Sequence, residues 1–198
     1  MTKDWIGNKT TTFATLGASS HSKHEREQND YYATDPSAVD PLIPFLPINR
    51  HVWECACGEG HLAKRLEKLG FYVESTDLID RGFGQSGVDF LKTIKADYNG
   101  EMIITNPPYK FAQEFVEHAL TITNEGSYIC MFLKLTFLEG QKRRKLFDKS
   151  PPYKVLVFSA RQKCALNGEF EKTDSSAACY AWFIWVNGFK GKTTIEWI

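Results

Sequence analysis

The sequence HVWECACGEGHLAKRLEKL, residues 51–69, carries the clearest indication of the fold. Its apolar start predicts a buried strand over His51–Cys57, and its leucines at helical spacing predict a helix over His61–Leu69. Gly58 and Gly60 fall in the turn between the two, where glycine lets the backbone turn tightly and approach a ligand closely. A strand, a glycine turn and a helix in this order indicate the first unit of a parallel βαβ fold.

The same alternation continues along the chain and predicts an α/β fold, with a mostly parallel central sheet and helices on both faces. The run ACYAWFIWV near the end is apolar on both faces, as an interior strand should be. The expected strands are His51–Cys57, Phe71–Thr76, Glu101–Thr105, Ser127–Leu133, Tyr153–Ser159 and Ala178–Val186, and the expected helices are Pro36–Phe45, His61–Leu69, Phe111–Ile122 and Leu138–Phe147.

Length and charge narrow the possible functions. The chain has 198 residues, 42% of them hydrophobic, which is enough for one domain with its own core. Lys plus Arg number 24 and Asp plus Glu number 24, so the formal net charge is zero. This balance excludes a protein that holds nucleic acid through bulk positive charge. Any contact with nucleic acid must therefore come from basic residues gathered on one face.

The first 28 residues are polar and predict a flexible tail, or else a segment that orders over a ligand. They lack the apolar stretch of a signal peptide, and no apolar run reaches the length of a membrane span, so we expect a cytoplasmic protein that does not enter a membrane.

The cysteines lack metal-ligand spacing and predict reduced packing residues, with no metal site. They are Cys55, Cys57, Cys130, Cys164 and Cys179.

The glycine turn carries the features of a cofactor site. Asp77 ends the second expected strand, where its carboxylate can accept hydrogen bonds from both hydroxyls of a ribose. The turn also satisfies the dinucleotide fingerprint. However, Glu54 lies within the first strand, where a carboxylate disfavours a pyrophosphate and suits a cofactor with a cationic end, such as S-adenosylmethionine. Asp89, with Phe90 beside it, can accept from an adenine amino group or can act as a helix cap.

A second loop, Asn106-Pro107-Pro108-Tyr109, follows an apolar strand directly. The prolines fix the loop and remove two donors, so the Asn106 side-chain oxygen and the Pro107 carbonyl can both accept from one amino group. Tyr109 offers a flat face on which a ring can stack. Two acceptors localise the lone pair of an amino nitrogen conjugated with a ring, which is what its methylation requires. Alternatively, the loop is only a rigid turn from strand to helix.

With both loops in place, the chain resembles class I S-adenosylmethionine-dependent methyltransferases of the amino-methylating type. More specifically it is similar, over about residues 29–198, to small N6-adenine DNA methyltransferases of bacteriophages and prophages. The resemblance implies a Rossmann-like fold with an antiparallel C-terminal strand, and a catalytic domain over 29–198 without a separate target-recognition domain. It implies DNA as the partner, with specificity supplied by loops, the tail, a second copy of the chain or another protein.

The resemblance also assigns roles to single residues. Asparagine rather than serine at position 106 favours adenine over the N4 amino group of cytosine. Two departures from the family pattern are Cys55, where proline is frequent, and Asp35, which interrupts a Thr-Pro pair. The implied cofactor contacts are Tyr31, Thr34, Glu54, Cys55, Gly58, Gly60, Asp77, Leu78, Asp89, Phe90 and Asn106, and the implied catalytic residues are Asn106, Pro107, Pro108 and Tyr109.

Basic residues that follow the strands can gather at the carboxyl edge and contact phosphates, or can simply form a solvated face. They are Lys110, Lys134, Arg143, Arg144, Arg161 and Lys163. Three alternatives to a DNA methyltransferase stay open: the same chemistry on RNA, the same chemistry on a protein glutamine, and a methyltransferase fold that only binds a partner. A dinucleotide-dependent oxidoreductase leaves the Asn-Pro-Pro-Tyr loop unexplained.

Overall fold

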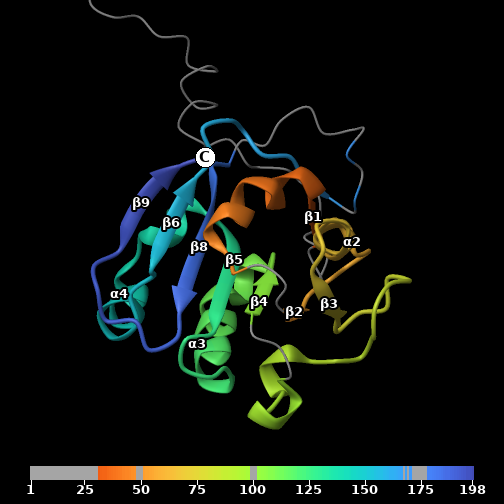
Figure 1. The fold of residues 1–198 in the computed structure, drawn as a ribbon, viewed down its shortest axis with the longest axis horizontal. Helices are drawn as coiled ribbons and strands as arrows, with labels where there is room; N and C mark the ends of the chain where they lie inside the picture. The colour runs from red at the N-terminus through yellow and green to blue at the C-terminus, as the bar shows by residue number, and fades with distance from the viewer. Residues whose placement is uncertain (1–30, 48–50, 99–101, 167, 169, 171–177) are drawn as a thin grey trace, which may run out of the picture.

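The computed structural model describes residues 31–47, 51–98, 102–166, 168, 170 and 178–198, and the tail predicted over residues 1–28 lies outside them. A sheet of seven strands, in the order β3-β2-β4-β5-β8-β6-β9, forms the centre of the molecule (Figure 1). All its strands run parallel except β8, which is antiparallel to both neighbours, so the expected mostly parallel sheet is confirmed. The strands are β2 (His51–Glu54), β3 (Tyr72–Ser75), β4 (Met102–Thr105), β5 (Tyr128–Lys134), β6 (Lys154–Val157), β8 (Tyr180–Val186) and β9 (Thr194–Trp197).

Helices cover both faces of this sheet, as predicted. The α-helices are α2 (His61–Lys68), α3 (Ala112–Ile122) and α4 (Gln141–Lys149). The 3-10 helices are η1 (Pro36–Phe45), η2 (Phe90–Lys92), η3 (Lys95–Asp97), η4 (Tyr109–Phe111) and η5 (Leu135–Leu138). The segment η1 contains Pro41 and Pro44, which have no backbone N–H to donate, and this accounts for a 3-10 helix in place of a regular α-helix. Asp35 caps η1 by accepting from the Ser37 amide at 2.9 Å.

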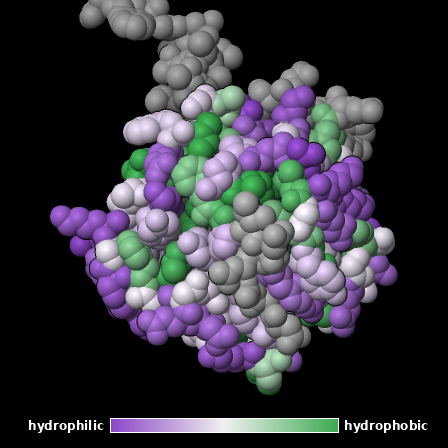
Figure 2. Space-filling model, in the orientation of Figure 1, coloured by the Kyte–Doolittle hydropathy of each residue, from purple (hydrophilic) through white to green (hydrophobic). Residues whose placement is uncertain are grey.

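The side chains of the interior strands alternate between two cores, one on each face of the sheet. On β5, Ile129 and Met131 pack into the core under α3 and α4, whereas Cys130 and Phe132 pack into the core under η1 and α2. On β8, Trp185 belongs to the first core and Trp182 to the second. Hydrophilic side chains dominate the rim of the molecular face drawn in Figure 2, with hydrophobic ones near its upper centre.

Three short strands were not predicted. β1 (Tyr32–Thr34) and β7 (Cys164–Leu166) pair antiparallel as a separate ribbon, in which Thr34 lies opposite Cys164. The third is β9, which pairs parallel with β6 at the edge of the main sheet. The ribbon contacts the main domain near the ends of β2 and β4, so it contributes directly to the candidate site.

The cysteines are all free, and Cys55, Cys57, Cys130 and Cys164 are buried, as expected of packing residues, while Cys179 is exposed. Within the described ranges, no helix combines the length and the apolar character needed to cross a membrane.

A buried hydrogen bond joins η1 to the sheet, and we expect its loss to lower the stability of the fold. The Trp182 indole N–H donates to the Ala38 carbonyl at 2.7 Å, with both residues buried. Trp182→Phe leaves that carbonyl unsatisfied, and we expect it to lower the free energy of unfolding by about 1–3 kcal/mol beyond the packing loss. Urea denaturation followed by circular dichroism measures the change.

The matched control is Trp185→Phe. The Trp185 indole donates to the Ser150 carbonyl at 3.0 Å, but Ser150 is only partly buried, so water can replace the lost donor. We expect a clearly smaller loss for this variant, and equal losses in the two variants would contradict the role assigned to the Trp182 bond.

Candidate active site

Three adjacent parallel strands, β3, β2 and β4, place their carboxyl ends side by side at one edge of the sheet. Glu54 ends β2, Asp77 follows β3 and Asn106 follows β4. Ligands of open α/β sheets bind at this edge, because the loops after the strands converge there. The topology thus brings together the residues that the sequence predicts for the two loops.

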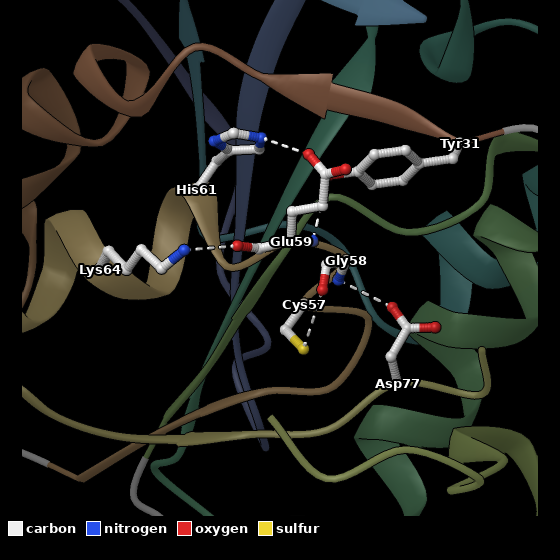
Figure 3. Close-up of polar contacts among 7 residues, drawn as sticks. All are labelled: Tyr31, Cys57, Gly58, Glu59, His61, Lys64 and Asp77. Atoms are coloured by element: carbon white, nitrogen blue, oxygen red, sulfur yellow. Dashed lines mark hydrogen bonds and ion pairs between the residues drawn. The ribbon is translucent and has the colours of Figure 1, made fainter. Parts of the chain in front are cut away.

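Asp77 ties the glycine turn to the end of β3. One carboxylate oxygen accepts from the Gly58 amide at 2.8 Å (Figure 3). The other accepts from the Ile79 amide at 2.9 Å. Gly58 has φ +55° and Gly60 has φ +79°, a left-handed backbone that other residues adopt only with strain. The carboxylate therefore holds two strand-end loops in one fixed arrangement.

Tyr31 lies across the glycine turn. Its hydroxyl accepts from the Glu59 amide at 3.1 Å, and a Cβ at Gly58 would stand only 2.3 Å from its ring (Figure 3). Burial raises the pKa of Tyr31 to about 12, so its hydroxyl stays neutral. The Arg81 guanidinium lies 4.4 Å from the ring centroid. The turn thus needs glycine at position 58 because an aromatic ring rests on it.

Phe83 covers Gly60 in the same way, with its ring 2.3 Å from the position that a Cβ at Gly60 would take. Sequence reasoning missed both Phe83 and Arg81, since neither belongs to a motif. Only their place in the loop after β3, which returns to the glycine turn, brings them to the site. On the other side of the turn, a carboxylate oxygen of Glu59 lies 3.0 Å from Nε2 of His61 (Figure 3). The backbone carbonyl of Glu59 accepts from the Lys64 ammonium at 2.8 Å.

Glu54 is a buried carboxyl with no cationic partner among the described residues. It is 1% exposed, and no described residue forms a hydrogen bond with either of its carboxylate oxygens. Burial raises its pKa to about 8, the neighbouring Thr105 hydroxyl lowers it in part, and the charge of Asp77 raises it further. A cationic group beside Glu54 would favour the ionised form. The residue is therefore suited to receive positive charge from a ligand.

Asn106 presents its side-chain oxygen as an acceptor. The amide nitrogen of Asn106 donates to the Tyr32 carbonyl of β1 at 2.8 Å, which fixes the orientation of the side chain. The amide oxygen is buried, and among the described residues it has no hydrogen-bond partner. A buried, oriented and unsatisfied acceptor favours a ligand with an N–H to donate.

Tyr109 is packed beneath the ribbon. Its hydroxyl lies 3.8 Å from the Cys164 sulfur of β7, and burial raises its pKa well above the usual value. Its ring centroid lies 6.1 Å from that of Tyr32 and 6.0 Å from that of Tyr180. The Lys134 ammonium stands 4.8 Å from the ring centroid. The aromatic face that the sequence assigns to stacking thus carries a cation in this structure.

The other predicted cofactor residues have mixed surroundings. Thr34 is buried in β1, Leu78 is exposed after β3, and Cys55 is buried in the core. Asp89 accepts from the Leu91 amide at 3.2 Å and pairs with Lys92 at 2.8 Å, which is the helix-cap alternative. Phe90 is buried in the core, where its ring packs against Trp53.

The predicted basic group is gathered only in part. Lys134 and Arg143 border one cavity, together with Tyr109. In contrast, Arg144 pairs with Asp148 at 2.7 Å on the exposed side of α4, and Arg161 donates to the Cys179 sulfur at 2.9 Å. Lys110 and Lys163 are exposed, the first with its ammonium 5.3 Å from the Phe111 ring centroid. Two cations out of the six therefore share a site with the Asn-Pro-Pro-Tyr loop.

Solved structures show which class of proteins shares this fold. A candidate class I S-adenosylmethionine-dependent methyltransferase of Listeria monocytogenes matches with a TM-score of 0.59 and 13% identity, over 96% of this chain and 72% of that one. A candidate RNA methyltransferase of Pyrococcus horikoshii matches with a TM-score of 0.59 and 14% identity, over 93% and 100%. The chain thus has the fold of class I S-adenosylmethionine-dependent methyltransferases.

A third similar structure is a modification subunit of a candidate type I restriction enzyme of Vibrio vulnificus, with a TM-score of 0.53 and 10% identity. The match covers 93% of this chain but only 48% of that subunit. No protein-family profile matches the sequence, and no curated protein matches it either.

The raised pKa of Glu54 predicts a pH dependence of stability. The pKa is about 8 in the folded chain and 4.5 without perturbation, so the folded state binds more protons between these values. The free energy of unfolding should therefore fall as the pH rises from about 4.5 to about 8. Glu54→Gln removes this contribution, and we expect its stability relative to wild type to increase from pH 5 to pH 8 in urea titrations.

Glu67→Gln is the matched control for this measurement, since Glu67 is an exposed carboxylate on α2. Its stability relative to wild type should change little over the same pH range. Parallel pH profiles for wild type and Glu54→Gln would show that Glu54 is ionised in the folded state at neutral pH.

Proposed function

We propose that this protein transfers a methyl group from S-adenosylmethionine to the N6 amino group of adenine in DNA. The observation that carries the proposal is the state of Asn106: its amide nitrogen is held by the Tyr32 carbonyl, and its oxygen is buried without a partner in the described part of the chain. The N–H groups of an exocyclic amino group can donate a hydrogen bond to this oxygen.

The residues around the glycine turn fit S-adenosylmethionine, and a solved structure with this fold is described as an S-adenosylmethionine-dependent methyltransferase. Glu54 offers a buried carboxyl to a cationic methionine end, and the Asp77 carboxylate lies where a ribose can reach it. Gly58 and Gly60 let the backbone approach the ligand, and Tyr31 with Thr34 covers the methionine end. Asp89 can accept from adenine only by exchanging one of its present partners, Leu91 or Lys92.

The chain's own residues position the target nitrogen. Asn106 accepts one amino hydrogen through its side-chain oxygen, and Pro107 accepts the other through its backbone carbonyl. These two bonds localise the nitrogen lone pair, which is otherwise delocalised into the ring. When bound, the cofactor supplies a sulfonium-activated methyl group: a nitrogen–carbon bond forms as the sulfur–carbon bond breaks, and the nitrogen then loses a proton to solvent.

Tyr109 and Pro108 complete the loop. Pro108 restricts the backbone before Tyr109, and the ring of Tyr109 is fixed by its contacts with Tyr32 and Tyr180. A base flipped out of a duplex gains about 1–3 kcal/mol by stacking on such a ring, which offsets part of the cost of flipping. The proposal requires the Lys134 ammonium to leave this face when the base enters.

DNA is the substrate that we propose, because Asn106 stands at the first position of the loop and a restriction-modification subunit shares the fold. RNA is the second candidate, because the Pyrococcus protein described as an RNA methyltransferase matches over its whole length. Specificity would come from loops, a second copy of the chain or a partner protein.

Methyl transfer tests the proposal directly. Labelled S-adenosylmethionine is incubated with duplex DNA, single-stranded DNA, RNA and a protein extract, and the products are identified by mass spectrometry. We expect N6-methyladenine in DNA, and at least a roughly 100-fold lower rate with Asn106→Ala, because a preorganised hydrogen-bonding group at the reacting atom is lost.

Asn124→Ala is the matched control, since Asn124 is exposed in the loop before β5, and its activity should equal that of wild type. Label found only in RNA or protein would overturn the DNA assignment. Cofactor binding without transfer to any substrate would indicate a binding module.

Cofactor binding has its own signature at Glu54. If a cationic group binds beside this carboxyl, the pKa of about 8 falls and the protein releases close to one proton at pH 6.5. Isothermal titration calorimetry in buffers of different ionisation enthalpy counts that proton. We expect Glu54→Gln to lose the release and to bind S-adenosylmethionine more weakly, whereas Glu67→Gln should match wild type. Proton release unchanged in Glu54→Gln would place the cationic group elsewhere.

A further inference from the structure

A small cavity of about 100 Å³ lies beside the Asn-Pro-Pro-Tyr loop, on the side of Tyr109 that faces β5 and α4. It is formed where the start of α3, the end of β5, the turn η5 and helix α4 meet. Its lining residues are Tyr109, Ala112, Leu133, Lys134, Thr136, Phe137 and Arg143. Two cations and a hydroxyl thus share a partly apolar cavity that has no carboxylate in its lining.

Among the described residues, neither cation has an acidic partner. In the described ranges, the basic residues Arg65, Lys92, Arg144 and Lys154 each form an ion pair with a carboxylate. No ion pair with a carboxylate involves Lys134 or Arg143 within those same ranges. In a chain with zero formal net charge, two uncompensated cations in one cavity form a local positive site.

Arg143 is held in place by neutral groups. Its Nε donates to the Phe137 carbonyl at 2.8 Å, and its Nη2 donates to the Thr136 carbonyl at 3.0 Å and to the Glu139 carbonyl. These carbonyls fix the guanidinium without cancelling its charge. Arg143 is therefore a preorganised cation, and the ordering of its long side chain is already complete before a ligand binds.

Lys134 connects the cavity to the target site. Its ammonium lies 4.8 Å from the centroid of the Tyr109 ring, and Tyr109 is the last residue of the loop that begins with Asn106. Ala112 also lines the cavity and begins α3, whose N-terminal end adds a partial positive charge. An anion in the cavity would lie next to a base that stacks on Tyr109 and donates its amino hydrogens to Asn106.

We propose that this cavity binds a backbone phosphate of the nucleic-acid strand that carries the target base, with Lys134 and Arg143 as its two cationic contacts. This inference rests on the proposed function for the place of the base. A phosphodiester is the anion that comes with such a base, and Arg and Lys recognise it by charge-assisted hydrogen bonds. The ammonium of Lys134 leaves the Tyr109 face as the base enters, and it pairs with the phosphate instead.

The salt dependence of DNA binding tests the cavity without relying on catalysis. A fluorescent single-stranded 20-mer that contains adenine is titrated with the full chain between 50 and 300 mM salt. Each phosphate contact adds roughly 0.7–0.9 to the slope of log K against log salt. We expect Lys134→Gln to lower that slope by about one and to weaken binding roughly five- to tenfold at 0.1 M salt.

Two further variants make the result specific. Lys134→Arg keeps the charge and should restore the wild-type slope. Lys68→Gln removes an exposed charge from the far end of α2 and should leave the slope unchanged. Arg143 is left intact, because its hydrogen bonds to three carbonyls support the fold, and circular dichroism confirms that each variant is folded.

Free phosphate and dAMP separate the sources of the anion. We expect neither to displace the 20-mer beyond its contribution to ionic strength. Displacement by either at submillimolar concentration, lost in Lys134→Gln, together with an unchanged DNA slope, would overturn the assignment to a strand. An equal fall of the slope in Lys134→Gln and Lys68→Gln would also overturn it.

The two proposals fail in different ways. If wild type methylates adenine but Lys134→Gln keeps the wild-type slope, the phosphate cavity is wrong and the proposed function stands. If Lys134→Gln loses the slope but no adenine is methylated, the cavity binds a strand and the proposed reaction is wrong.

Discussion

The interior strands β2, β4, β5 and β8 are covered on both faces, and this constraint determines where chemistry can occur in the molecule. Val52, Met102 and Trp182 are each 0% exposed, and most positions along these strands are apolar. Polar groups appear where the strands end, at Glu54, and just beyond, at Asn106. The parallel arrangement then collects those ends at one edge of the sheet.

The ribbon of β1 and β7 completes that edge from a distance in sequence. Its first strand, β1, does not pair with the main sheet, but the Tyr32 carbonyl accepts from the Asn106 side chain. Its second strand, β7, brings Cys164 against the Tyr109 hydroxyl. Without the ribbon, the Asn106 amide could rotate and present its nitrogen to the target. The orientation of the candidate catalytic group therefore depends on chain segments outside the motif.

Local patterns predicted much of this molecule, and non-local contacts account for the rest. The apolar runs predicted every interior strand, and the two loops were predicted because their residues are consecutive. β1 and β7 have only three residues each, too few for a periodic signal, and β9 is a largely exposed strand at the edge of the sheet. The Asn106–Tyr32 bond spans 74 positions, and Phe83 reaches Gly60 only through the folded loop after β3. For Asp89 the sequence supported both a cap and a ligand contact, and its present partners are those of a cap.

Tyr31 immediately precedes β1 and Tyr32 begins it, yet Tyr31 contacts the glycine turn and Tyr32 holds Asn106. A displacement of the backbone in this segment consequently disturbs both halves of the site at once. The lining at Lys134 and Arg143 comes from β5 and α4 and shares no residue with β1. Substitutions on that side can therefore accumulate one at a time while the contacts of the glycine turn stay unchanged.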